Sequence, residues 1–246
     1  MGEVYRNPPA VEALCEFHFD PGSPWDVTVF GHYYDRIGRE FSEKRQLPQV
    51  TMSMQQSENG VAGEFREAGV RMQFARPDRA ALVQLAPHLL VINKLPPYES
   101  WGAFRALIMA YLEEYLAVAG RPPIQRVELR YINRFDFPAG GFTVGDRFGS
   151  SEFLPIRLRQ AGAPFFLRLE MPGGVRETLT LTLGLVDSQQ RDQLSALLDL
   201  SYITLAPGAL DVAALPAQLD RAHDKIEEAF ESCLTEALRQ QFRGEG

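Results

Sequence analysis

Apolar and polar residues alternate along several short stretches of the chain, which is the pattern of strands with one buried face. The first stretch is 11–19, where Val11, Cys15 and Phe19 alternate with Glu12 and Glu16. The remaining alternating stretches are 50–56, 70–74, 81–95, 125–137, 165–171, 177–186 and 197–205. They predict further strands, with Val50, Met52 and Met54 turned inward in the second and a bend at Pro87 in the long 81–95 strand.

Other stretches carry apolar residues at helical spacing. One helix is expected after a cap at Ser23 or Asp26 and before Pro48, with an apolar face of Val29, Phe30, Tyr33, Tyr34, Ile37 and Phe41. A second begins after the capping residue Ser100 and ends at Gly120. A single last helix is expected over 215–242, and the Gly- and Pro-rich segment 138–163 holds at most a short helix near 152–160.

Both halves of the chain have the same order of expected elements: a strand, a helix or loop, three strands and a long helix. The sequence therefore predicts an α+β fold with a pseudo-duplicated antiparallel sheet and its long helices packed on one face. The expected halves are 1–121 and 122–246, fused into one globular unit. Chance similarity is the alternative explanation, because the two halves share little sequence identity.

Composition excludes several classes of protein. Hydrophobic residues make up 45% of the chain and charged residues 23%, close to globular averages, so a disordered or fibrous chain is excluded. The formal net charge of −7 does not favour a strongly basic binding surface. The chain shows neither an apolar leader segment nor a run of 18 apolar residues, and Cys15 and Cys233 lie far apart. We expect a cytoplasmic protein without membrane contact or a disulfide framework.

No local catalytic motif stands out. Phosphate-binding glycine loops and serine-nucleophile motifs are missing, and the four histidines are scattered without metal-ligand spacing. We therefore assign no catalytic residue, no metal and no cofactor, and the sequence favours a non-enzymatic protein. Two weaker alternatives stay open: His18 as a general base, and Glu12 with Glu16 as a metal-binding or acid–base pair on an open strand face.

The most distinctive segment is 126–137. Strand alternation places Arg126, Arg130 and Arg134 on one face together with Glu128 and Asp136. Such a row of arginines would grip phosphate groups or the carboxylates of a partner. The alternative is a set of cross-strand ion pairs with neighbouring carboxylates, for which Glu12, Glu16 and Glu170 are the candidates.

Asn133 points to the opposite, apolar face, where its amide needs a partner. Backbone exposed at a bend or bulge of the sheet is the simplest one. The predicted binding residues are Arg126, Arg130, Arg134, Asn133 and Glu12.

Two motifs resemble an uncharacterised, sporadically distributed family of bacterial and archaeal proteins of about this length. They are the opening Asn7-Pro8-Pro9-Ala10-Val11-Glu12-Ala13 and the central Leu129-Arg130-Tyr131-Ile132-Asn133-Arg134. That family opens with an Asn-Pro-Pro-x-Val-Glu-Ala strand and carries a Leu-Arg-Tyr-Ile-Asn-Arg motif after a long helix. Ala10 replaces the branched residue usual at its position. The resemblance implies no established activity, and the family's distribution is similar to that of mobile or defence-associated genes.

These observations lead to two hypotheses. The first is a non-enzymatic binding or assembly subunit, a homodimer or part of a larger protein complex, in a phage-defence or toxin-control system. The second is a protein that binds nucleic acid or a nucleotide on the sheet face through Arg126, Arg130 and Arg134.

The second hypothesis makes a direct prediction about salt. Lysine and arginine contacts to phosphates release counterions, so affinity for nucleic acid should fall steeply between about 50 and 200 mM salt. A filter-binding titration at both salt concentrations measures this. An affinity independent of salt would count against the hypothesis.

Overall fold

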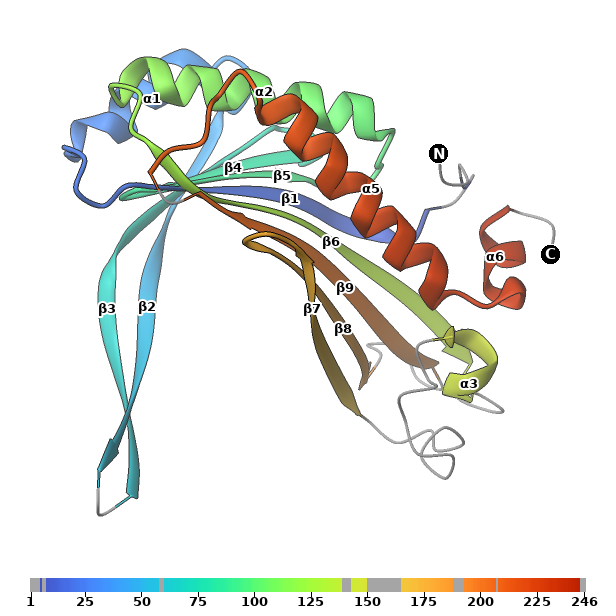
Figure 1. The fold of residues 1–246 in the computed structure, drawn as a ribbon. Helices are drawn as coiled ribbons and strands as arrows, with labels where there is room; N and C mark the ends of the chain where they lie inside the picture. The colour runs from blue at the N-terminus through green and yellow to red at the C-terminus, as the bar shows by residue number, and fades with distance from the viewer. Residues whose placement is uncertain are drawn as a thin grey trace.

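The chain forms an α+β structure with one large antiparallel sheet (Figure 1). The computed structural model describes residues 5, 8–57, 60–138, 143–149, 165–187, 193–206 and 208–243, and the side chains of 49–68 and 187 are not described. The strand order across the sheet is β2-β3-β4-β5-β1-β6-β9-β8-β7. The strands are β1 (Ala10–Phe19), β2 (Glu43–Ser57), β3 (Gly60–Ala75), β4 (Ala81–Ala86), β5 (Leu89–Lys94), β6 (Ile124–Pro138), β7 (Phe166–Gly174), β8 (Glu177–Asp187) and β9 (Gln193–Leu205).

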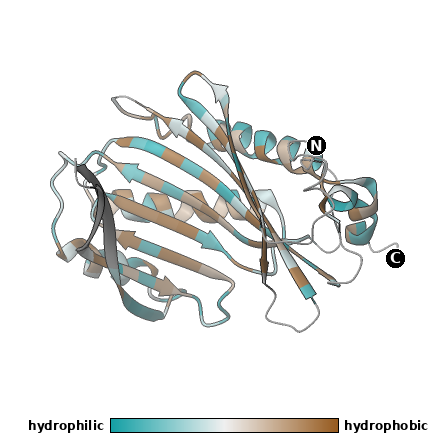
Figure 2. Ribbon diagram, turned by 90° about the horizontal axis from the view of Figure 1, so that it is seen from below, coloured by the Kyte–Doolittle hydropathy of each residue, from teal (hydrophilic) through white to brown (hydrophobic). Residues whose placement is uncertain are grey.

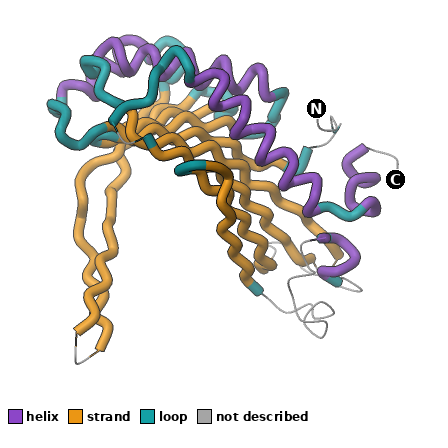
Figure 3. The backbone as a smooth tube through the Cα atoms, in the orientation of Figure 1, coloured by secondary structure: helices purple, strands orange, loops and turns teal. Residues whose placement is uncertain are grey.

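The long helices all lie on the same face of the sheet (Figure 3), as the sequence predicts. The helices are α1 (Thr28–Ile37), α2 (Trp101–Val118), α3 (Val144–Arg147), α5 (Leu215–Cys233) and α6 (Glu236–Arg243). Ser100 caps α2 by accepting a hydrogen bond from the Ala103 amide at 3.2 Å. The helix ends where Gly120 takes a φ of 73°, a left-handed conformation that glycine adopts without strain.

Strands β1 and β6 pair antiparallel at the centre of the sheet, with Cys15 opposite Leu129 and Phe17 opposite Val127. These residues face the helices and are buried. Ile108, Leu112 and Tyr115 of α2 belong to the same core cluster. The core therefore lies between the sheet and the helices, as the alternation of apolar residues predicts.

The sheet curves away from the helix layer, so its uncovered face is concave (Figures 1 and 3). Figure 2 views this concave face and shows polar and apolar residues alternating along its strands. A curved antiparallel sheet with one covered and one open face explains why the strands alternate in sequence.

The expected single strand over 81–95 is wrong. Pro87 and His88 form a tight turn between β4 and β5, with Ala86 paired to Leu89. His88 takes a φ of 56° after the proline, whose ring fixes φ near −65°. Proline followed by a residue with positive φ reverses the chain, so the feature expected to bend one strand separates two.

Strands β2 and β3 are much longer than the 50–56 and 70–74 strands expected, and only Met72–Ala75 of β3 pair with β4. A bulge interrupts the β2–β3 ladder: Gln49 pairs with Gly69 and Val50 with Glu67, so Ala68 is an extra residue. Gly69 there has a φ of 124°. Beyond this bulge the two strands project from the body as a ribbon, here called the β-arm (50–57 and 60–68) (Figure 1).

The expected single helix over 215–242 is two helices. Leu234 is extended and forms an isolated bridge with Phe148. The Thr235 hydroxyl donates to the Asp146 and Arg147 carbonyls at 2.9 and 3.1 Å. These tertiary contacts with α3 break the helix at a point where the sequence pattern continues.

The repeated element order holds only in part. Four strands follow α1 in the first half, whereas three strands precede α5 in the second. The expected short helix near 152–160 and the inward orientation of Val50, Met52 and Met54 lie outside the described residues. In those residues no helix combines the length and the apolar character needed to cross a membrane.

Truncation of a buried side chain of α2 should show how much the packing of this helix contributes to the free energy of unfolding. Leu112→Ala removes a fully buried side chain and should lower the free energy of unfolding by about 2–5 kcal/mol. Leu205→Ala, at a residue that is 51% exposed, is the matched control. Urea denaturation of both variants measures the difference, and equal losses would contradict the packing described here.

Candidate functional site

The three predicted arginines lie on the concave face, opposite the helices. Along β6 they alternate with residues that are buried on the helix side, such as Val127 and Leu129. Glu12 of β1 lies beside this row, paired in register with Ile132. Asn133 lies on the helix face, so the structure does not bring all five predicted residues together.

Each arginine in the row has a carboxylate partner. Arg130 binds Asp199 of β9 through Nε at 2.8 Å and through a second contact from Nη2. Arg126 contacts Glu128, and Nε of Arg134 lies 3.0 Å from Asp136 Oδ1. The arginine row is therefore part of a charge-balanced network rather than a free positive surface.

The three arginines thus form ion pairs within the chain, as the alternative predicted. Their partners, however, are not the carboxylates that the sequence suggested. Glu12 accepts from the Asn93 amide at 2.7 Å, Glu16 pairs with His18, and Glu170 pairs with Arg168. Arg126 and Arg134 instead reach carboxylates two residues along their own strand, because alternate residues of a strand share a face.

These contacts shift the pKa values of the carboxyl groups. Nε2 of His18 lies 3.1 Å from Glu16 Oε2, and this hydrogen bond lowers the pKa of Glu16 despite partial burial. Burial raises the pKa of Asp136, but hydrogen bonds from Ser195 and Arg134 outweigh it and the net shift is downward. Both shifts favour the ionised carboxylates, and a phosphate approaching Arg134 would have to displace Asp136.

A second candidate lies on the helix face, at the join of the two halves. A cavity of about 120 Å³ opens between α5, β6, β9, the turn before α2 and the N-terminal segment. We call it the junction cavity. Its polar lining comes from Tyr5, Tyr98, Tyr131, Asn133, His223, Glu227 and Glu231.

Two tyrosines and a histidine occupy one side of the junction cavity. The hydroxyls of Tyr98 and Tyr131 are 2.8 Å apart and hydrogen-bonded. Burial raises the pKa of Tyr98 to about 12. The His223 ring stacks on Trp101 with centroids 4.5 Å apart, and burial there lowers its pKa against the opposing effect of nearby Glu227.

Asn133 bonds to backbone, as expected, but not at a bend or bulge. Its Nδ2 donates to the Leu198 carbonyl at 3.2 Å, and the residue is only 4% exposed. The β1–β6 ladder shifts register between Ala10 and Glu12, where Ala10 pairs with Asn133. The bulge thus lies on the β1 side of Asn133, whereas its partner lies on the β9 side, where the ladder is regular; Asn133 also lines the junction cavity.

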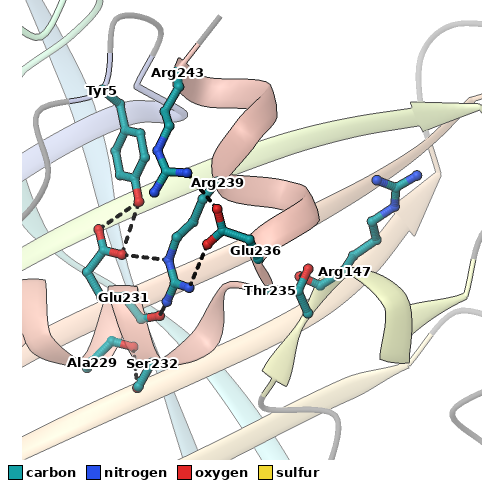
Figure 4. Close-up of polar contacts among 9 residues, drawn as sticks. All are labelled: Tyr5, Arg147, Ala229, Glu231, Ser232, Thr235, Glu236, Arg239 and Arg243. Atoms are coloured by element: carbon teal, nitrogen blue, oxygen red, sulfur yellow. Dashed lines mark hydrogen bonds and ion pairs between the residues drawn. The ribbon is translucent and has the colours of Figure 1, made fainter. Parts of the chain in front are cut away.

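The N-terminal segment is held against the cavity by an ion-pair network (Figure 4). The Tyr5 hydroxyl donates to both carboxylate oxygens of Glu231, at 2.9 and 3.0 Å. Arg239 of α6 donates from Nε to the same carboxylate at 3.0 Å and lies near Glu236, which Arg243 also contacts. Helix α6 thus fixes the side of the cavity formed by Tyr5.

Both segments that carry the family resemblance reach this cavity. Pro8, Pro9 and Ala10 of the opening motif line it, as do Tyr131 and Asn133 of the central motif. More than a hundred residues separate these motifs in sequence, and the β1–β6 pairing brings them together.

Sequence reasoning missed Tyr5, Tyr98, His223 and Glu227. One signal was present: His223 and Glu227 occur in the same helical stripe as the cavity-lining Ile226 and Phe230. Polar residues within an apolar stripe indicate a buried polar site. Within the described residues His223, Asp224 and Glu227 are also the group whose ligand atoms lie within 4.8 Å of one another.

Comparison with known proteins adds little. No family model matches the chain, and no curated protein matches it. Among solved structures it is similar to the crystal structure of the di-domain ARO/CYC StfQ from the steffimycin biosynthetic pathway, at 13% identity and a TM-score of 0.20, covering 95% of this chain and 98% of that chain. A similarity this weak carries no argument about function, and the family resemblance of the two motifs stays a prediction.

The burial of His223 predicts a pH dependence of stability. Its folded pKa lies below the ordinary value of 6.5, so the unfolded chain binds the proton more tightly. Stability contributed by neutral His223 should be complete above pH 6.5 and fall as the pH drops below it, by at most about 1.4 kcal/mol per pH unit.

Urea denaturation at pH 7.5 and 5.5 measures this loss. His223→Gln should reduce the difference between the two pH values, whereas His32→Gln, at an exposed residue of α1, should leave it unchanged. An identical pH dependence in wild type and His223→Gln would show that the imidazole is not the group responsible.

Proposed function

We propose that this protein is a non-enzymatic binding subunit that assembles with a second copy of itself through the β-arm. The observation that carries the proposal is the ribbon itself. Beyond the Gln49–Gly69 bulge, the described strands of the β-arm pair with each other and with no third strand. An isolated two-stranded ribbon is marginally stable in water, so contact with another molecule would stabilise it.

The edges of the β-arm suit such an assembly. Each edge of a two-stranded ribbon presents unpaired backbone N–H and C=O groups, which pair readily with a strand of another chain. A contact in which each copy presents the same ribbon to the other closes with two-fold symmetry, the commonest arrangement of soluble oligomers. A second copy is therefore the simplest partner for this surface.

The concave face would then lie beside the partner, because the β-arm descends on the side away from the helices (Figure 1). Its paired arginines and carboxylates offer exposed charges of both signs. Arg130 and Asp199, for example, keep 37% and 20% of their side-chain surface exposed. Balanced charges of this kind orient a protein partner more than they add affinity.

Nucleic-acid or nucleotide binding through Arg126, Arg130 and Arg134 stays a prediction, tested by its salt dependence. Phage defence or toxin control, the setting that the family resemblance implies, also stays a prediction. Purification of the protein with its partners from its own host would address both.

We also propose that the two halves arose by duplication. Outward from the centre, the first half runs β1-β5-β4-β3 and the second β6-β9-β8-β7, and a long helix, α2 or α5, follows the strands of each half. On this proposal β2 is the strand added to the first half, and it forms the β-arm with β3.

Removal of the β-arm tests the assembly proposal. Replacing residues 50–68 by Asn-Gly joins Gln49 to Gly69 through a two-residue hairpin turn. Native mass spectrometry should show two copies of the 27.6 kDa chain in the wild type and one in this variant. Val175→Lys, in the exposed β7–β8 turn at the other end of the sheet, is the control and should remain dimeric.

A wild-type protein that is monomeric at all concentrations would contradict the proposal, as would a dimer that persists without the β-arm. Thermal unfolding of the variant should stay close to that of the wild type, since it keeps Met72–Ala75, the residues of β3 that pair with β4.

A further inference from the structure

A cavity beside the first three turns of α2 contains a buried lysine, and we propose that it binds the carboxylate of a small aliphatic acid. Its volume is about 360 Å³, in the size range of small-molecule sites. We call it the α2 cavity. Its polar lining consists of Glu40, Arg76, Lys94, Glu99 and Tyr111, and its remaining lining is one side of α2. None of these residues belongs to the β-arm, so the inference is independent of the proposed assembly.

Lys94 is the last residue of β5 and lies on the helix face of the sheet, two residues after the core residue Ile92. It pairs in register with Ala13 of β1 and Ala81 of β4, whose small side chains leave room for its aliphatic stem. The Lys94 side chain is only 8% exposed. Lysine is rarely buried to this extent unless it is paired, because burial removes water from the ammonium group. An anion beside Lys94 is therefore required.

The protein supplies a carboxylate of its own at this point. Nζ of Lys94 lies 3.0 Å from Oε1 of Glu99, which is its one hydrogen-bond partner among the described residues. The Glu99 side chain is 56% exposed, so the cation lies in the cavity wall and its carboxylate partner at the rim. Ordering an exposed side chain in an ion pair costs conformational entropy, and such pairs are weak. The carboxylate of a ligand can therefore take the place of Glu99.

A second ion pair of the α2 cavity has the same arrangement. Nη2 of Arg76 lies 2.7 Å from Oε2 of Glu40, and the Arg76 side chain is 29% exposed whereas that of Glu40 is 61% exposed. The Arg76 guanidinium also lies over the Phe41 ring and interacts with the Tyr111 hydroxyl. These contacts hold the cation in place, while its carboxylate partner again lies at the rim.

Helix α2 favours an anion and provides an apolar surface. Ala103, in its first turn, lines the cavity, and the partial positive charge of a helix N-terminus attracts anions and repels a lysine. Ala106, Leu107 and Ala110 continue the lining along the helix. An aliphatic chain would bury apolar surface against these residues while its carboxylate reaches Lys94. This burial gives a ligand an advantage over the Glu99 carboxylate.

A cation attracted by the two glutamates fits the cavity less well. It would draw Glu40 and Glu99 away from Arg76 and Lys94, which would leave two cations in the wall without partners. An unpaired buried charge costs more than an unpaired exposed one, and the cations are the more buried members of both pairs. An anionic ligand instead releases the exposed carboxylates into water.

Isothermal titration calorimetry of the full chain at pH 7.5 tests the proposal with three probes of equal length: hexanoate, 1-hexanol and n-hexylammonium. We expect hexanoate to bind at least tenfold more tightly than the other two. Lys94→Met keeps an unbranched side chain and removes the charge, so it should weaken hexanoate binding at least tenfold. Lys225→Met, at an exposed residue of α5 paired with Glu228, is the matched control and should bind like the wild type.

Two further variants separate ligand binding from effects on folding. Glu99→Gln removes the competing carboxylate at an exposed position and should strengthen hexanoate binding about threefold or more. Ala106→Phe fills the cavity without changing a charge and should abolish binding, whereas Ala117→Phe, at an exposed residue of α2 outside the lining, should not. The proposal is overturned if hexanoate does not bind, if n-hexylammonium binds equally well, if Lys94→Met or Ala106→Phe binds like the wild type, or if Glu99→Gln weakens binding.

Discussion

Strands β1 and β6 lie side by side at the centre of the sheet, and their ladder joins the residues before Gly120 to those after it. Their inward side chains, including Phe17 and Leu129, are fully buried under the helices. Every other strand is added outward from this pair, so its register determines which side chains face the core and which face the concave surface. A shift by one residue would exchange the two faces.

The two faces therefore have different chemistry. On the helix side, the pairing brings the opening and central motifs together around the junction cavity. Hydrogen bonds and charges act more strongly there than in water, because the local dielectric constant is low. On the concave side, arginines and carboxylates neutralise one another in partly exposed pairs. Such pairs each contribute about 0–1 kcal/mol to stability, so their arrangement matters more for partner orientation than for folding.

Much of the fold was predictable because alternation and helical spacing are local properties. The β1 and β6 strands, the Ser100 cap and the end of α2 at Gly120 all follow from residues within a few positions of each feature. The break at Leu234 was not predictable, since Phe148 and Arg147, nearly ninety residues away, cause it. The same holds for β2 and β3, whose pairing with each other extends them beyond their apolar stretches.

The candidate site shows the same division. The side of the sheet on which Arg130 and Asn133 lie follows from alternation, and so does the need of Asn133 for a backbone partner. The partner of Arg130 does not, because Asp199 becomes its neighbour only when β9 pairs with β6. Tyr98 and His223 meet Tyr131 through packing between distant segments, which a single sequence does not specify.

We infer that the β1–β6 ladder holds the two halves together as one cooperative unit. Native-state hydrogen exchange measured by NMR tests this inference. The amides of this ladder, such as those of Cys15 and Leu129, should exchange only through global unfolding and be among the slowest in the chain. Faster exchange there than in the interiors of β4–β5 and β8–β9 would contradict it, since the halves would then separate before either unfolds.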